Sequence, residues 1–340
     1  MMKTIKNSFF LFILFLVFLS CSKKKTSIDG GILEPSHGGR NKVVLVIDDS
    51  LWTGAVGDSI RSQLAQPTEG LSKHEPIFDL VQYDSRIFSN RARMYRNVVL
   101  FSLHNGQEFV LEKSLYATPQ NFFFIRAKTT DDLIKLFKIN ADSIISVFQA
   151  SELNEEMHKV VRSSTQELEE LKTFFGCTLK IPDSYYLQME NDFPFLWYQR
   201  DLSSGNLNLV LYEFPISEIE NNKGSIEDHL IEARNFVGNE FLKTAKEGAY
   251  LTTGNKLPIK ISQLKVHNMP VYRISGNWKT VNDFLEGPFI CYVLRDEYYN
   301  RYLFIDGFVN NPFKDKRDQL LEMEAIMKTI NFNEHSNQSF

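Results

Sequence analysis

The pattern of apolar segments changes near the middle of this 340-residue chain, and this change constrains the fold more than any other feature. In the first half, runs of β-branched and aromatic residues alternate with segments of helical periodicity. Strands that alternate with helices pair in parallel, because each helix carries the chain back to the start of the next strand. The first half therefore predicts a three-layer α/β domain with a mainly parallel sheet.

Four strands are expected in this domain, and the first is the clearest. The segment from Lys42 to Ile47 is a continuous apolar run, which is typical of a strand buried on both faces. Ser50 follows and can cap a helix. Further strands are expected at 78–83, 97–102 and 121–126, a short helical segment at 89–95, and a helix with a long apolar stripe at 130–148.

A charged helix is expected from Ser151 to Phe175, where apolar positions are sparse. Such a helix suits a connector that is docked on one side and solvated elsewhere. Beyond Gly176, consecutive strands in hairpins predict an α+β domain, with helices packed on an antiparallel sheet. The expected strands are 178–181, 185–189, 194–199, 206–212, 259–266, 269–278, 287–294 and 301–309, and the expected helices are 225–245 and 316–330.

The start of the chain has the pattern of a bacterial lipoprotein signal. Lys3 and Lys6 precede an unbroken apolar run from Phe9 to Leu19, and Ser20 stands before Cys21. The run is too short to span a bilayer and is followed at once by lysines. We therefore expect cleavage after residue 20 and lipidation of Cys21 with acyl chains such as palmitate. An ordinary secretory signal and a transmembrane anchor are the alternatives.

The segment after Cys21 bears on where the protein is held. It is rich in Lys, Gly and Ser, so it predicts a flexible tether. Ser22 in place of an aspartate favours the outer membrane, and the lack of an acidic tract favours its periplasmic face. The expected organisation is a signal peptide at 1–20, a tether at 21–42, an α/β domain at 43–175, an α+β domain at 176–333 and a disordered tail at 334–340.

Composition disfavours nucleic acid as a partner, because the net charge is -4 and acids and bases are interspersed. Only Cys177 and Cys291 remain besides the lipidation site, and both lie in segments that read as strands. In an oxidising periplasm the two thiols could form a disulfide. The alternative is that each is a small buried hydrophobic residue.

Asp48 and Asp49 are the best candidates for chemistry, because open α/β sheets bind ligands at the carboxyl ends of their strands. Paired carboxylates can hold a hard cation such as Mg²⁺ and support a hydrolase. Ser50 departs from the phosphotransfer pattern, in which a second aspartate takes that place. The alternative interpretation is that both carboxylates favour the amino terminus of a helix.

Aromatic residues make up 13% of the chain, and exposed rings on one sheet face can bind carbohydrate or lipid. Trp52, Trp197 and Trp278 are the candidates for such a surface. Most of the rings lie in strands whose alternate residues face a core, so packing is the alternative explanation.

Four segments read together as a family signature: Val43–Gly54, Tyr250–Thr253, Ser275–Trp278 and Gly287–Phe289. They resemble the domain-of-unknown-function family DUF4837 of Bacteroidota-type lipoproteins, over essentially the whole mature chain. The resemblance implies an envelope lipoprotein and implies no activity. The order of elements in the second half is also similar to that of Mog1/PsbP-like α/β/α sandwiches, which informs the fold alone.

The sequence shows no nucleophile elbow, phosphate loop or dinucleotide fingerprint, and we expect no cofactor. Whether the protein is an enzyme is therefore open, and the lack of these motifs favours a protein without catalytic activity. We expect a lipid-anchored, non-enzymatic binding or assembly module in the periplasm, whose partners are the membrane and an envelope protein or small ligand. The alternatives are a metal-assisted hydrolase at Asp48 and Asp49 and a carrier of lipid or glycan.

Overall fold

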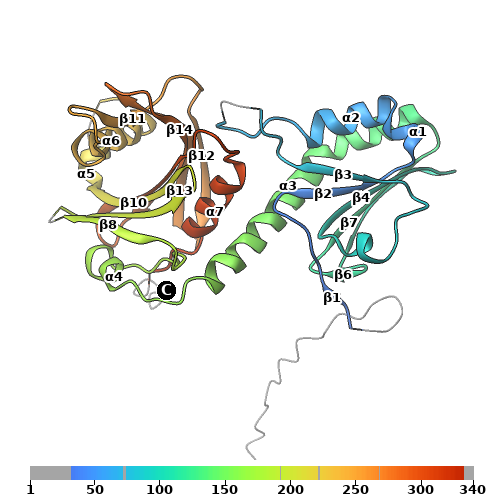
Figure 1. The fold of residues 1–340 in the computed structure, drawn as a ribbon, viewed down its shortest axis with the longest axis horizontal. Coiled ribbons are helices and arrows are strands. Elements are labelled where there is room, and N and C mark those ends of the chain that lie inside the picture. Colours follow the sequence, from blue (N-terminus) through green and yellow to red (C-terminus); the bar gives the residue numbers. More distant parts are fainter. Residues whose placement is uncertain (1–31, 72–73, 192, 221–222, 268, 333–340) are drawn as a thin grey trace, which may run out of the picture.

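The computed structural model describes residues 32–71, 74–191, 193–220, 223–267 and 269–332. Two large sheets lie within these ranges, each with its own helices, and one long helix runs from the first to the second (Figure 1). The fold class expected from the sequence is confirmed, since the first sheet is mostly parallel and the second is antiparallel.

The first sheet has five strands in the order β3-β2-β4-β7-β5. Its strands are β2 (Lys42–Val46), β3 (Asp79–Tyr83), β4 (Asn97–Leu103), β5 (Glu108–Lys113) and β7 (Asn121–Ala127). Only β5 is antiparallel, and the sequence did not predict it because its apolar run is only three residues long, Phe109 to Leu111. Two short strands, β1 (Glu34–Pro35) and β6 (Ala117–Thr118), pair beside the sheet.

The two faces of the first sheet are covered differently. The α-helices α2 (Ala55–Leu64) and α3 (Thr130–Arg162) pack on one face, and the single turn α1 (Asp49–Trp52) lies at its end. The other face is covered by the short 3₁₀ helix η1 (Asn90–Met94) and by the loop that contains β6. The third layer expected from the sequence is therefore thin.

Helix α3 is one continuous 33-residue helix, where the sequence predicted separate helices on either side of residue 150. No Gly or Pro interrupts it, so it extends for about 50 Å. Phe137 and Phe148 lie in the core of the first sheet, whereas Val160 lies in the core of the second. The apolar stripe thus packs on the first sheet along one part of the helix and on the second sheet near its end, without a break in the helix.

The second sheet has the strand order β11-β13-β14-β15-β10-β9-β8, with β12 also paired to β13, and it curls into a half-barrel (Figure 1). Its strands are β8 (Tyr186–Asn191), β9 (Phe195–Leu202), β10 (Gly205–Pro215), β11 (Tyr250–Thr253), β12 (Lys260–Val266), β13 (Met269–Val281), β14 (Glu286–Asp296) and β15 (Arg301–Asn310). The strand expected at 178–181 is wrong, because this segment makes only an isolated bridge between Thr178 and Asn331.

Helices cover both faces of the second sheet. One face packs on α5 (Ile216–Glu220) and α6 (Ile226–Phe241), and Ser225 caps α6 by accepting a hydrogen bond from the Asp228 amide. The other face packs on α4 (Glu169–Phe175), on α7 (Arg317–Met327) and on the end of α3. The apolar residues of α4 thus belong to the second core.

Candidate functional site

A cleft of about 650 Å³ lies where the two halves of the molecule meet. Its walls come from the loop at 66–69, from α3 and α7, and from β12 and β13. The apolar lining includes Ile77, Ile145, Leu153, Leu320 and Leu321. The leucines of the two helices are only partly buried, so they leave apolar surface open to a bound molecule.

Charged side chains of both signs frame this cleft. Lys260 pairs with Glu69 at 3.1 Å, and Arg273 makes two hydrogen bonds to Glu324, at 2.8 and 3.1 Å. Burial raises the pKa of Glu324, but the hydrogen bonds and charge of Arg273 outweigh it and hold the pKa below its ordinary value. Glu324 is therefore ionised at neutral pH, and the cleft combines an apolar floor with a rim of ion pairs.

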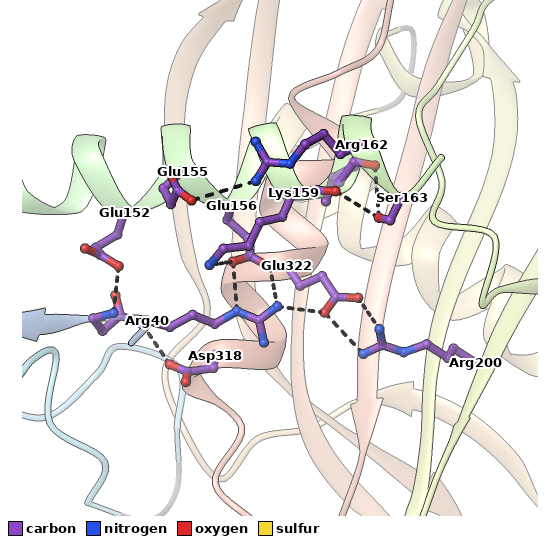
Figure 2. Close-up of polar contacts among 12 residues, drawn as sticks. Arg40, Glu152, Glu155, Glu156, Lys159, Arg162, Ser163, Arg200, Asp318 and Glu322 are labelled. Atoms are coloured by element: carbon purple, nitrogen blue, oxygen red, sulfur yellow. Dashed lines mark hydrogen bonds and ion pairs between the residues drawn. The ribbon is translucent and has the colours of Figure 1, made fainter. Parts of the chain in front are cut away.

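A network of charges from both halves lies beside the cleft (Figure 2). Arg40, just before β2, donates to Glu156 of α3 with its Nε at 2.8 Å, and its Nη2 lies 3.4 Å from Glu322 of α7. Glu322 also pairs with Arg200 of β9 at 2.8 Å. The side chains of Glu156 and Glu322 are only 2% and 5% exposed, so buried carboxylates join α3, α7 and β9 to the segment just before β2.

Glu152 pins α3 to the first sheet. Its side chain is 2% exposed and accepts hydrogen bonds from the Arg96 guanidinium at 2.9 and 3.0 Å, the Asn97 amide group at 2.8 Å and the backbone N–H of Asn41 at 2.8 Å. A buried carboxylate with this many donors is fully satisfied. Asn41 itself lines the cleft and donates to Asp318 of α7 at 2.8 Å, which continues the network into the second half.

The amino terminus of α7 is capped by a residue from the other half of the molecule. The buried carboxylate of Glu75 accepts the backbone N–H groups of Lys316 and Arg317 at 2.6 and 2.8 Å. These are two of the donors that a helix leaves unpaired at its start, and a negative charge there also complements the helix dipole. The Arg317 side chain in turn donates to the Pro76 carbonyl at 2.6 Å. Contacts of this kind hold the cleft walls in fixed positions.

Asp48 and Asp49 lie at the carboxyl end of β2, as the sequence predicts. Asp48 accepts from the Ser85 hydroxyl at 2.5 Å, and Asp49 accepts from the Gln82 side chain at 3.0 Å. Across the described part of the chain, no group of three or more His, Cys, Asp or Glu residues is placed to hold a metal ion. The aspartates sit at the start of α1, but neither makes a side-chain cap to it.

The three tryptophans do not form one surface. Trp278 is 2% exposed and donates its indole N–H to the Val309 carbonyl at 3.2 Å. Trp197 is half-buried against the same core, and Trp52 packs on the other domain under the Arg61 guanidinium, 4.4 Å from its ring centroid. None of the three lines the cleft, so packing accounts for them better than ligand binding.

Cys177 and Cys291 are free and buried, so the disulfide considered from the sequence is not formed. They lie in the cores on opposite faces of the second sheet, which keeps them apart. Burial raises the pKa of the Cys177 thiol to about 12. The interpretation as small buried hydrophobic residues holds for both.

Sequence reasoning missed the residues that build the cleft and its network. Glu152 and Glu156 were counted among the solvated charges of a connector helix, although both are buried. Their spacing of four places them on one helix face with Val160, and this spacing is a signal that the face is covered.

Other expectations concern residues outside the described ranges. The signal peptide, Cys21, residues 21–31 of the tether expected at 21–42 and the tail at 334–340 fall there. The rest of that expected tether packs on the first domain, since Leu33 and Asn41 are buried and Glu34–Pro35 pairs with Ala117–Thr118. Among the residues that are described, no helix is long and apolar enough to cross a membrane.

Two family models match the sequence, one in each half. The domain of unknown function DUF8532 matches residues 36–161, and the domain of unknown function DUF4837 matches residues 164–329. The resemblance to DUF4837 is confirmed for the second half, whereas the segment Val43–Gly54 falls within DUF8532.

Comparison with solved structures finds Mog1 proteins. The Ran-binding protein Mog1p of Saccharomyces cerevisiae is 8% identical, with a TM-score of 0.30 over 47% of this chain and 92% of that protein. A mutant of protein Mog1 is 10% identical, with a TM-score of 0.30, and the match covers 49% of this chain and 95% of the Mog1 chain. No curated protein matches the sequence.

Proposed function

We propose that this chain, which joins a DUF8532 domain to a DUF4837 domain, is a lipid-anchored binding module of the bacterial cell envelope. It is non-enzymatic and holds an amphipathic segment of a partner protein in the cleft between its domains. The preformed cleft is the observation that carries the proposal. Ligand sites favour such interfaces, and their volumes are roughly 300 to 1,000 Å³.

The charges around the cleft favour a polypeptide segment over a lipid chain. An acyl chain is best held in a closed apolar cavity, whereas this cleft has Lys260, Arg273 and Arg317 at its rim together with Glu69 and Glu324. A peptide segment offers apolar side chains for the leucine floor and charges of both signs for the rim. The buried network beside the cleft fixes the walls in advance, which lowers the ordering cost of binding.

The anchor is supported by the sequence pattern that ends at Cys21. In this proposal the acyl chains on Cys21 hold the protein at the outer membrane, with both domains in the periplasm. The Cys21→Ala variant is expected to leave the membrane fraction, which cell fractionation and immunoblotting would measure. Equal membrane association of the variant and the parent would contradict the anchor.

Site-specific photocrosslinking in intact cells tests the cleft. A benzophenone amino acid in place of Gln149, an exposed residue of α3 that lines the cleft, is expected to give a discrete adduct. The matched control places it at Ile139, which is on the same helix, is 81% exposed and lies outside the cleft. Adding Leu321→Arg should abolish the adduct at position 149, with folding checked by circular dichroism. Equal adducts at both positions, or an adduct that survives Leu321→Arg, would refute the cleft as the binding site.

A further inference from the structure

The position where the described chain begins limits how the first domain can face a membrane. Ile32 is eleven residues after Cys21 and is 67% exposed. Eleven residues span at most about 40 Å when fully extended. A lipid on Cys21 therefore keeps Ile32, and β1 directly after it, within that distance of the bilayer.

The segment after Ile32 is fixed against η1 at one end of the first domain (Figure 1). The backbone N–H of His37 donates to the Met94 carbonyl at 3.0 Å, and the His37 ring hydrogen-bonds the Arg91 carbonyl at 2.8 Å. The rings of His37 and Tyr95 also pack edge to face, 4.5 Å apart. The chain thus joins the domain beside the arginines of η1.

Arg91 and Arg93 are exposed, and among the described residues neither is paired with an acidic side chain. The Arg93 guanidinium lies 5.3 Å from the centroid of the Tyr116 ring, which belongs to the loop that contains β6. Exposed Lys113 precedes this loop, and the exposed acids of the region are Glu34 and Glu112. Lys113 donates to the side-chain oxygen of Asn121, whereas Arg91 and Arg93 are not held by a carboxylate within the described residues.

Within the described residues, no α-helix packs on this face of the sheet, and aromatic rings cover it instead. Tyr83, Tyr95, Tyr116 and Phe124 are partly buried in the small core of this face and keep part of their surface in solvent. The tyrosine rings, which have one apolar and one polar end, favour the headgroup level of a bilayer, and arginines beside them are attracted to anionic lipids.

We infer that this face, made of β1, η1 and the loop at 113–120, docks on the anionic headgroups of the membrane that holds Cys21. The inference rests on the proposed lipid anchor. The anchor supplies attachment, and the docking face supplies orientation, because it turns one side of the first domain toward the lipid. Loss of Arg91 and Arg93 should then change the orientation of the first domain on the membrane without releasing the protein from the membrane.

Amide hydrogen exchange of the full-length lipidated protein tests this surface. The protein is reconstituted in vesicles that contain phosphatidylglycerol and, separately, in vesicles of phosphatidylcholine alone. We expect slower exchange of residues 88–94 and 113–118 with phosphatidylglycerol, and loss of this protection at high salt. Each arginine near an anionic surface is worth about a fivefold change in equilibrium, so Arg91→Ala with Arg93→Ala should weaken docking about 25-fold.

The control variant removes the same charge from the other side of the sheet. Lys135 and Lys138 are exposed residues of α3. The variant with Lys135→Ala and Lys138→Ala should leave the protection of residues 88–94 and 113–118 from exchange unchanged. Equal exchange in both kinds of vesicle, or equal effects of the two double variants, would overturn the docking face. Vesicle flotation in the same samples separates the two proposals, because a protein that fails to float contradicts the anchor and one that floats without protection contradicts only the docking.

Discussion

At the scale of single residues, the family signature of the second half is explained by packing. Arg234 of α6 is 1% exposed, pairs with Asp306 at 2.9 Å and donates to the Thr253 hydroxyl at 3.0 Å. Its guanidinium lies 3.7 Å from the centroid of the Phe289 ring. Thr253 and Phe289 belong to two signature segments, so these segments meet around a buried ion pair rather than at an open site.

Gly287, in the same signature, allows a close approach of two strands. A Cβ atom at this position would lie 2.1 Å from the Val309 carbonyl oxygen and 2.9 Å from Nε1 of Trp278. Backbone cannot move aside as a flexible side chain can, so only glycine fits between β14 and β15. This explains the residue without any role in binding.

The Gly287→Ala variant is expected to lose about 3 kcal/mol of free energy of unfolding, because its methyl group forces the strands apart. Urea denaturation followed by circular dichroism would measure the loss. Gly106→Ala is the control, since the nearest atom to its added Cβ is 3.8 Å away in the His104 side chain. A loss at position 287 no larger than the one at position 106 would show that the strands relax freely.

At the scale of elements, the sequence predicted the strands and helices that have a clear apolar pattern of their own. Strands β12 to β15 were expected within a few residues of their bounds, because their apolar residues alternate with polar ones or run together and polar turns separate the strands. Strand β5 was missed because most of its residues are only half-buried. A strand was expected at 178–181, but only Thr178 pairs there, in an isolated bridge to Asn331, which is distant in sequence. The cleft could not be predicted, since it depends on how α3 and α7 meet.

The continuity of α3 is the element-level feature that couples the two domains. Ala150, near its middle, is exposed, while the two ends of the helix pack in different cores. Ala150→Pro removes one helical hydrogen bond and clashes with the preceding turn, at a cost of about 3 kcal/mol. We expect differential scanning calorimetry to show two transitions for this variant and one for the parent. Ala150→Ser, which keeps the backbone N–H, should retain the single transition, and a single transition in the proline variant would show that the other junction contacts suffice.

At the scale of the whole molecule, buried carboxylates hold the two halves together. Glu156 contacts Arg40 and Lys159, and Glu322 links Arg40 to Arg200 (Figure 2). Taking such charges out of water is costly, so each must keep its partner. The junction is consequently specific in its geometry and sensitive to any change that removes one charge.

The pH dependence of the junction follows from Glu156. Burial raises the pKa of Glu156, but the hydrogen bond and charge of Arg40, with a contribution from Lys159, outweigh it and place the pKa below the ordinary value of 4.5. A carboxyl group with a lowered pKa in the folded state stabilises the fold above its ordinary value. That stabilisation is lost as the pH falls through the lowered value, because protonation then breaks the ion pair.

We therefore expect the free energy of unfolding to fall more steeply between about pH 5 and pH 3 in the parent than in Glu156→Gln, which has no proton to gain there. Urea denaturation at a series of pH values would measure both profiles. Glu324, whose pKa is also lowered, pairs with Arg273 rather than with Arg40, so the difference between the profiles reports Glu156 and its Arg40 partner. The variant should also be less stable at neutral pH, because Arg40 then lacks its carboxylate. Parallel profiles would mean that the Arg40 pair contributes nothing to the junction, and the fixed walls of the cleft would then have to rest on Glu75 and Glu152.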